Sequence, residues 1–167
     1  MAKGKAEKKD NGIEIADLSE LCSKAKQDEG IWFQMETDDG RKWDIDVLVY
    51  GNDSDKVQLY EREKMKERMK RINVNTGRRN RNIELDDETV DNVFDEQIES
   101  NLIRFGGIRK HSDQSALKLN GQELPVIKDD GNEHLYRALL EGSPDIAEFI
   151  LQMSKERSDF LSAGKKN

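Results

Sequence analysis

The chain of 167 residues carries a formal net charge of −7, and charged residues make up 38% of it, against roughly 25% in an ordinary globular domain. No run approaches the roughly 18–20 consecutive apolar residues of a membrane helix, and no apolar stretch follows the basic residues 1–5, so we expect neither a membrane anchor nor a secretory signal. The single cysteine, Cys22, excludes an intrachain disulfide and a cysteine-based zinc site. We expect a soluble intracellular protein that is short of core material.

Residues 1–12 are rich in lysine and almost free of apolar side chains, which indicates a disordered basic tail. The next module, residues 13–51, begins with a predicted helix over residues 17–28, in which apolar positions recur at helical spacing. Asp17 is its candidate N-cap and Gly30 its candidate stop. Its apolar stripe consists of Leu18, Leu21, Cys22 and Ala25.

Two runs of alternating apolar and polar residues follow, separated by Asp39 and Gly40. This pattern predicts a β-hairpin over residues 31–50. Its apolar positions are Ile31, Phe33, Met35, Trp43, Ile45, Val47 and Val49. An isolated hairpin is only marginally stable in water, so its apolar face needs a cover, and the helix over residues 17–28 is the nearest candidate.

Residues 52–105 are predicted to form a charged middle, with helices over 53–72 and 87–103 and a linker over 73–86. The basic helix has a thin apolar stripe of Val57, Met65, Met69 and Ile72. The acidic helix has a fuller one of Val90, Phe94, Ile98 and Leu102, with Val93 beside it.

Charge is segregated within this middle. Residues 61–82 hold nine bases and three acids, a net of +6, whereas residues 83–101 hold eight acids and no base, a net of −8. The basic patch comprises Arg68, Lys70, Arg71, Arg78, Arg79 and Arg81. We interpret the pattern as pairing between the two helices, within one chain or between subunits. Nucleic-acid binding and an unpaired, solvated face are the alternatives, and few aromatic residues are present to stack on bases.

Residues 106–162 are predicted to form a C-terminal module. Asn120 and Gly121 indicate a small hairpin, Gly106 and Gly107 end the preceding helix, and residues 108–116 are expected to be loop. Helices are predicted over residues 132–140 and from Ser143 onward. The last helix carries the apolar residues Ile146, Phe149, Ile150, Met153, Phe160 and Leu161, before a frayed end over 163–167. The predicted fold class is α+β with helix in excess.

Chemistry-bearing residues are few. His111 and His134 lack metal-type spacing, and the carboxylates of Asp44 and Asp46 are interpreted as the solvated face of the hairpin. The pair Asp53 and Asp55 resembles only the start of a calcium loop. No phosphate-binding glycine loop or nucleophile motif is present. We therefore expect no enzyme, no metal and no cofactor.

The order of elements resembles the tail assembly chaperones, or small minor tail proteins, of long-tailed bacteriophages, over roughly 90 residues. In the N-terminal half the likeness lies in Gly30-Ile31-Trp32-Phe33, the hairpin, and Gly51-Asn52-Asp53-Ser54-Asp55 opening a basic helix. In the C-terminal half it lies in the segment 119–125, a short helix, Ser143-Pro144-Asp145-Ile146-Ala147 and the segment 155–161. No pattern of this family accounts for the basic linker.

This resemblance implies a non-enzymatic protein of the host cytoplasm that coats the tape-measure protein and helps to recruit tail-tube subunits. The candidate partner-binding residues are Met65, Met69, Phe149, Ile150, Met153 and Phe160, which either contact the partner or belong to the core. A structural protein of the virion, in the tail or the head, is the alternative. A nucleic-acid-binding regulator that uses residues 62–81 is the third hypothesis.

Overall fold

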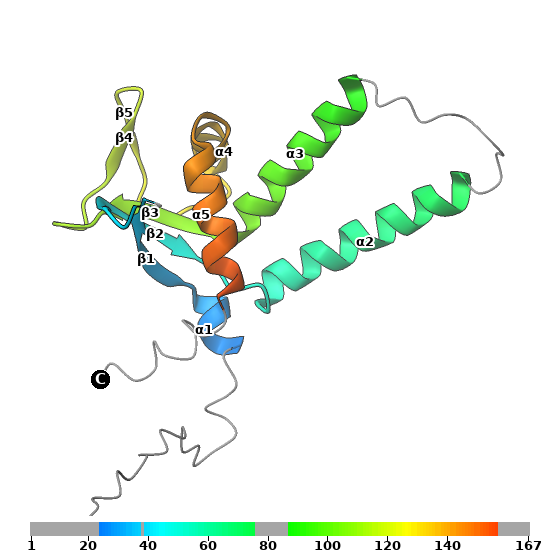
Figure 1. Ribbon diagram of the computed structural model, residues 1–167, viewed down its shortest axis with the longest axis horizontal. Coiled ribbons are helices and arrows are strands. Elements are labelled where there is room, and N and C mark those ends of the chain that lie inside the picture. Colours follow the sequence, from blue (N-terminus) through cyan, green and yellow to red (C-terminus); the bar gives the residue numbers. More distant parts are fainter. Residues whose placement is uncertain (1–23, 38, 76–86, 157–167) are drawn as a thin grey trace, which may run out of the picture.

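A computed structural model describes residues 24–37, 39–75 and 87–156. Its α+β fold has helix in excess, as predicted (Figure 1). The helices are α1 (Lys24–Glu29), α2 (Asp55–Asn75), α3 (Asp87–Arg104), α4 (Glu133–Gly142) and α5 (Pro144–Lys155). The strands are β1 (Ile31–Glu36), β2 (Lys42–Val49), β3 (Phe105–Lys110), β4 (Leu117–Leu119) and β5 (Gln122–Leu124).

The predicted N-terminal hairpin is confirmed. Strands β1 and β2 pair antiparallel, with Ile31 opposite Val49 and Phe33 opposite Val47. Gly40 adopts a positive φ of 79° in the turn, a conformation that is free of steric cost only for glycine. The small hairpin β4–β5 is confirmed as well, with a turn at Asn120 and Gly121.

The prediction of a loop after the acidic helix was wrong for residues 108–110. Strand β3 begins directly after α3 and pairs antiparallel with β2, so the sheet has the order β1-β2-β3. Gly107 lies so close to the segment that follows β5 that a Cβ atom there would clash with the Val126 carbonyl. The Ile108 N–H donates to that carbonyl at 3.0 Å, which ties the segment to the outer edge of β3.

One core joins the sheet to the C-terminal helices. Val47, Val49 and Phe105 pack with residues of α3, α4 and α5, so the apolar face of the hairpin rests on these helices. The helix over residues 17–28 that we predicted as its cover is described only in part. Of that predicted helix, the structure describes α1; residues 17–23 and the tail 1–12 lie outside the described residues. The ring of Tyr136 meets Phe105 edge to face, and burial raises the pKa of its phenol.

A cluster of polar side chains ties α2 and α3 to this core. Arg104, almost fully buried at the end of α3, donates from Nε to Asn52 Oδ1 at 3.0 Å and pairs with Glu61 Oε1 of α2 at 2.9 Å. Ser154 of α5 donates to the Tyr50 carbonyl at 2.7 Å. From this base α2 and α3 extend away from the sheet side by side, and we call the two helices the arm (Figure 1).

Candidate partner-binding surface

Opposite charges pair along the arm, as the interpretation of helix pairing within one chain predicted. Beyond the Arg104–Glu61 pair at the base, Lys64 Nζ lies 3.1 Å from Glu99 Oε2. Arg68 Nη2 lies 2.8 Å from Glu96 Oε1, and these hydrogen bonds raise the pKa values of Lys64 and Arg68. Exposed pairs of this kind contribute only about 0.2–1 kcal/mol each, so they fix the orientation of the helices more than they stabilise the fold.

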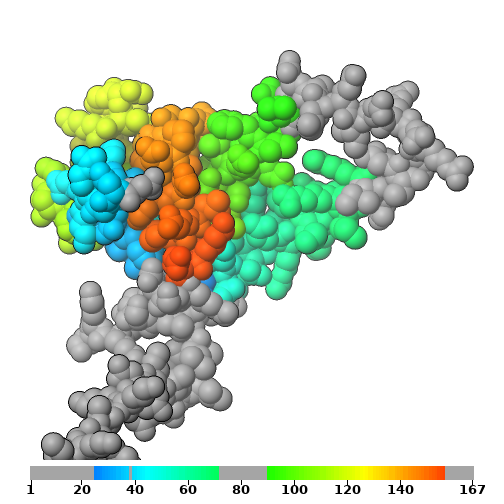
Figure 2. Space-filling model, viewed as in Figure 1, coloured from blue at the N-terminus to red at the C-terminus, as the bar shows by residue number. Residues whose placement is uncertain are grey.

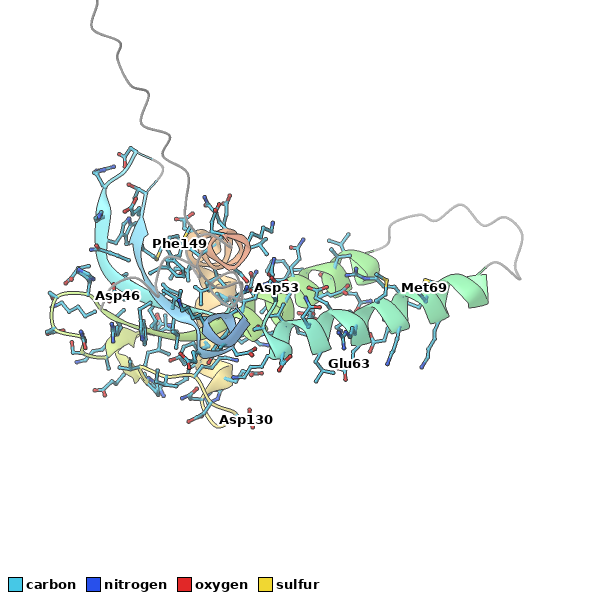
Figure 3. The ribbon with its side chains drawn as sticks, turned by 90° about the horizontal axis from the view of Figure 1, so that it is seen from below. Asp46, Asp53, Glu63, Met69, Asp130 and Phe149 are labelled. Carbon is cyan, nitrogen blue, oxygen red and sulfur yellow. The ribbon has the colours of Figure 1, made fainter. Side chains whose placement is uncertain are left out.

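Besides Leu59 on the outer side of α2, five large apolar side chains of the arm remain outside the core, each between 50% and 60% exposed. They are Met65 and Met69 on α2 and Val90, Val93 and Phe94 on α3, and we call them the arm face. Successive helical residues are about 100° apart around the axis, which places the α2 pair and the α3 residues on the same flank of the ion pairs. Figure 3 shows Met69 on the side of α2 that α5 also occupies, whereas Glu63 lies on the other side.

A groove continues the arm face toward the core. Its walls come from three helices, its volume is about 540 Å³, and we call it the arm groove. Val93 and Asn101 of α3 lie in one wall, α2 forms the second, and Leu151 of α5 lies at the inner end. Figure 2 shows α5 against the base of the arm. The Oδ1 atom of Asn101 is buried and has no hydrogen-bond partner.

The opposite flank of the arm is polar. A second hollow there, of about 420 Å³, is lined by Lys64, Glu67, Arg68, Arg71, Asn92, Val93, Asp95, Glu96 and Glu99. This hollow shares Arg68, Val93 and Glu96 with the arm groove, and Val93 is its one apolar side chain. Among the described residues of the arm, the exposed apolar side chains are therefore concentrated on the flank that carries the arm face.

The core covers only one half of the apolar stripe that was predicted on the acidic helix. Ile98 and Leu102, in the half nearest β3, are 4% and 2% exposed and belong to the core. Val90 and Phe94 extend the same stripe beyond the core and are half exposed. The sequence periodicity identified the stripe but not the position at which its cover ends.

Among the described residues, the partner-binding residues predicted on the last helix do not form one surface with the methionines of α2. Ile150 is fully buried, so it belongs to the core and is not a partner contact. Phe149 and Met153 pack against the core at the edge of a separate hollow between β1 and α5, and Figure 3 shows Phe149 beside the hairpin. Phe160 and Leu161 lie outside the described residues.

Only part of the predicted basic patch lies within the described residues. Arg68 is held by Glu96, whereas Lys70 and Arg71 are exposed on α2. The remaining members, Arg78, Arg79 and Arg81, lie outside the described residues. Because acidic residues of α3 lie beside α2, the visible part of the patch does not form a continuous basic surface.

The two carboxylates of β2 noted in the sequence, Asp44 and Asp46, bind residues of β3 and of the turn that follows it. Asp46, which is buried rather than solvated as predicted, accepts from Arg109 at 3.3 Å and lies 2.6 Å from His111 Nδ1. Asp44 accepts from the N–H of Ser112 at 2.8 Å. In the described part of the chain, no three His, Cys, Asp or Glu side chains gather as they would around a metal ion.

Two further results bear on function. Among the helices of the described residues, none combines the length and the apolar character that crossing a membrane requires. Comparisons with protein-family models, with curated proteins and with solved structures give no match to this chain.

Proposed function

We propose that the protein is a non-enzymatic tail assembly chaperone of a long-tailed bacteriophage. It acts in the host cytoplasm by binding apolar helical segments of the tape-measure protein along the arm face, and it helps to recruit tail-tube subunits. The observation that carries this proposal is the gathering of five half-exposed apolar side chains on one flank of a charged helix pair. An exposed apolar cluster of this kind marks an interaction surface.

The size of the surface fits reversible binding. Full burial of a large apolar side chain contributes about 1.5–3 kcal/mol, so covering the exposed half of five such residues gives about 4–8 kcal/mol before the cost of association. A chaperone has to release its client, and binding of moderate strength permits release. Methionine side chains adapt to differently shaped partners, which suits a client with many unlike helical segments.

The charge of the arm supports the same role. Its ion pairs hold α2 and α3 together without covering the arm face. A charged rim keeps a complex with an apolar client soluble. The nucleic-acid alternative has less support, because Arg68 is paired with Glu96 and acidic side chains border the basic helix.

Co-expression with the tape-measure and tail-tube proteins, followed by affinity capture, tests the proposal. We expect the tape-measure protein to be captured by the native chain and lost with Met65→Ser/Phe94→Ser. Leu59→Ser is the matched control, because Leu59 is as exposed as Met65 but lies on the outer side of α2. Capture of neither protein by the native chain would overturn the proposal, and stoichiometric presence of the chain in purified virions would favour the structural alternative.

A further inference from the structure

Strand β1 lies at the edge of its sheet and directs backbone groups outward. On β2, the Asp44 carbonyl accepts from the His111 N–H, so even-numbered residues of β2 direct their backbone groups to β3 and odd-numbered ones to β1. Phe33 lies opposite an odd-numbered residue of β2, so its neighbours Trp32 and Gln34 turn their N–H and C=O groups to the outer edge. Among the described residues, no backbone hydrogen bond uses these outward groups. The edge can therefore pair with a further strand.

A groove runs along this edge between β1 and α5. It consists of the hollow of about 600 Å³ beside Phe149 and Met153 and an adjoining hollow of about 200 Å³, and we call it the edge groove. The lining residues that the two hollows share are Glu36, Thr37, Phe149 and Gln152. Phe33 of β1 and the apolar side chains of α5 line its longer part. The 12 residues of α5 are roughly 18 Å long, which matches a strand of about five or six residues.

The end of the edge groove near the hairpin turn is acidic. Asp145 and Glu148 of α5 line it with exposed carboxylates, and neither has an ion-pair partner among the described residues. Glu36 lines the same end, and its carboxylate lies 3.5 Å from Lys42 Nζ. The two carboxylates of α5 therefore leave this end negatively charged. A strand that carries a basic residue here would be complementary to it in charge.

We propose that an extended segment of another protein adds to β1 in the edge groove as an antiparallel strand, with a basic residue at its N-terminal end and apolar residues at alternate positions after it. Antiparallel pairing is slightly more stable per residue than parallel pairing, and it places the N-terminal end of the added strand at the acidic end. Because side chains alternate along a strand, every second one faces Phe33, Phe149 and Met153. The site is separate from the arm face, and the inference does not depend on the proposed function.

Two other occupants fit the edge groove less well. If β1 of a second copy added antiparallel to β1, the residues before it, Asp28 and Glu29, would approach the acidic end, and β1 itself contains no basic residue. The chain's own residues 157–167 continue from the end of α5, where Met153 lines the groove together with Trp32 near the start of β1. An approach from that end would run parallel to β1, against the favoured direction.

Synthetic peptides of alternating valine and threonine test the proposal. One carries lysine at its N-terminal end, a second carries lysine at its C-terminal end, and a third carries glutamate in place of the N-terminal lysine. We expect the first to bind the full chain about fivefold more tightly than the second at low salt, and the third to bind most weakly. In the first peptide, N-methylation of an amide that faces β1 should weaken binding at least tenfold, whereas N-methylation of the neighbouring amide should have little effect.

A pair of protein variants tests the acidic end. With Asp145→Asn/Glu148→Gln, the first two peptides should bind equally, because the charge that orients the strand is removed. Glu123→Gln/Asp130→Asn makes the same change in net charge at exposed positions outside the groove and should leave the preference intact. In methyl NMR, the first peptide should shift the signal of Met153, while those of Met65 and Met69 on the arm face stay unchanged.

The outcomes separate this inference from the proposed function. Equal effects of N-methylation at neighbouring amides, a preference for lysine at the C-terminal end, or no binding of any peptide would overturn the inference without touching the arm face. If the lysine peptide binds only a chain that lacks residues 157–167, that segment occupies the groove and the inference is wrong. It is equally wrong if the chain alone is a dimer that the peptide dissociates, because a second copy then occupies the edge.

Discussion

Arg104 is the residue whose replacement should most clearly loosen the arm from the core. Its side chain is 6% exposed, and its guanidinium donates to Asn52, to the carbonyl and hydroxyl of Ser100, and to Glu61. Arg104→Met keeps the apolar length of the side chain and removes all four hydrogen bonds. We expect α2 to lose its fixed position relative to α3, because Arg104 is the buried contact between the two helices at their base.

The expected loss of stability follows from these contacts. A hydrogen bond contributes about 0.5–1.5 kcal/mol net, and about 1.5–3 kcal/mol when a charged group takes part. Glu61 is 45% exposed and regains water when its partner is lost, and folding no longer has to desolvate the guanidinium. We therefore expect unfolding to become easier by about 2–4 kcal/mol, or roughly 5–12 °C in Tm for a chain of this size.

Urea and thermal unfolding measure this loss, and hydrogen exchange along α2 reports the loosening of the arm. Arg137→Met is the matched control, since Arg137 is 35% exposed and its contacts with Asp95, Glu99 and Glu141 are 3.7–4.0 Å long. The control should cost less than about 1 kcal/mol. Equal losses in both variants, or unchanged exchange in α2 of Arg104→Met, would refute the assignment of Arg104 as the anchor of the arm.

Three further predictions concern the core. Gly107→Ala should cost at least about 1–3 kcal/mol by displacing the Val126 segment, whereas Gly142→Ala, which meets open space, should cost far less in the same urea titration. Because burial raises the pKa of Tyr136 while the unfolded phenol titrates near 10, stability should be fully present below about pH 10 and fall above it by up to about 1.4 kcal/mol per pH unit. Tyr136→Phe should flatten that fall, and an unchanged slope would contradict the assignment. Ile150→Ala should cost about 2–5 kcal/mol, as at a fully buried site; a loss below about 0.5 kcal/mol would show that Ile150 is not in the core.

Most elements of the fold were predictable, because they depend on local signals. Alternating residues around Asp39-Gly40 predicted the first hairpin, and Ser143 with Pro144 marked the start of α5. Strand β3 was not predictable in the same way. Gly106 and Gly107 read locally as a helix stop. A Cβ atom at Gly107 would meet the Val126 carbonyl of a later segment, and one at Gly106 would meet Leu48 of β2, so both contacts are distant in sequence.

The candidate site was predictable only in part. Helical spacing identified Phe94 and Ile98 as one stripe, but their exposure depends on how far α4 and α5 reach along α3. The same limit applies to the last helix, where Ile150 turned out to be buried and Phe149 to lie away from the arm. Whether two residues share one surface depends on how the helices are placed in three dimensions. The periodicity along a single helix gives no information on that placement.

The central claim is that a client binds along the arm face. Methyl NMR of the methionines tests it most directly, because some methionines lie on the arm face and others lie elsewhere in the fold. Met65 and Met69 lie on the arm face, Met35 lies in the core, and Met153 lies beside the separate hollow at β1. On titration with helical segments of the tape-measure protein, we predict that the signals of Met65 and Met69 shift while those of Met35 and Met153 stay unchanged. A titration that shifts only Met153, or none of these signals, would contradict the account.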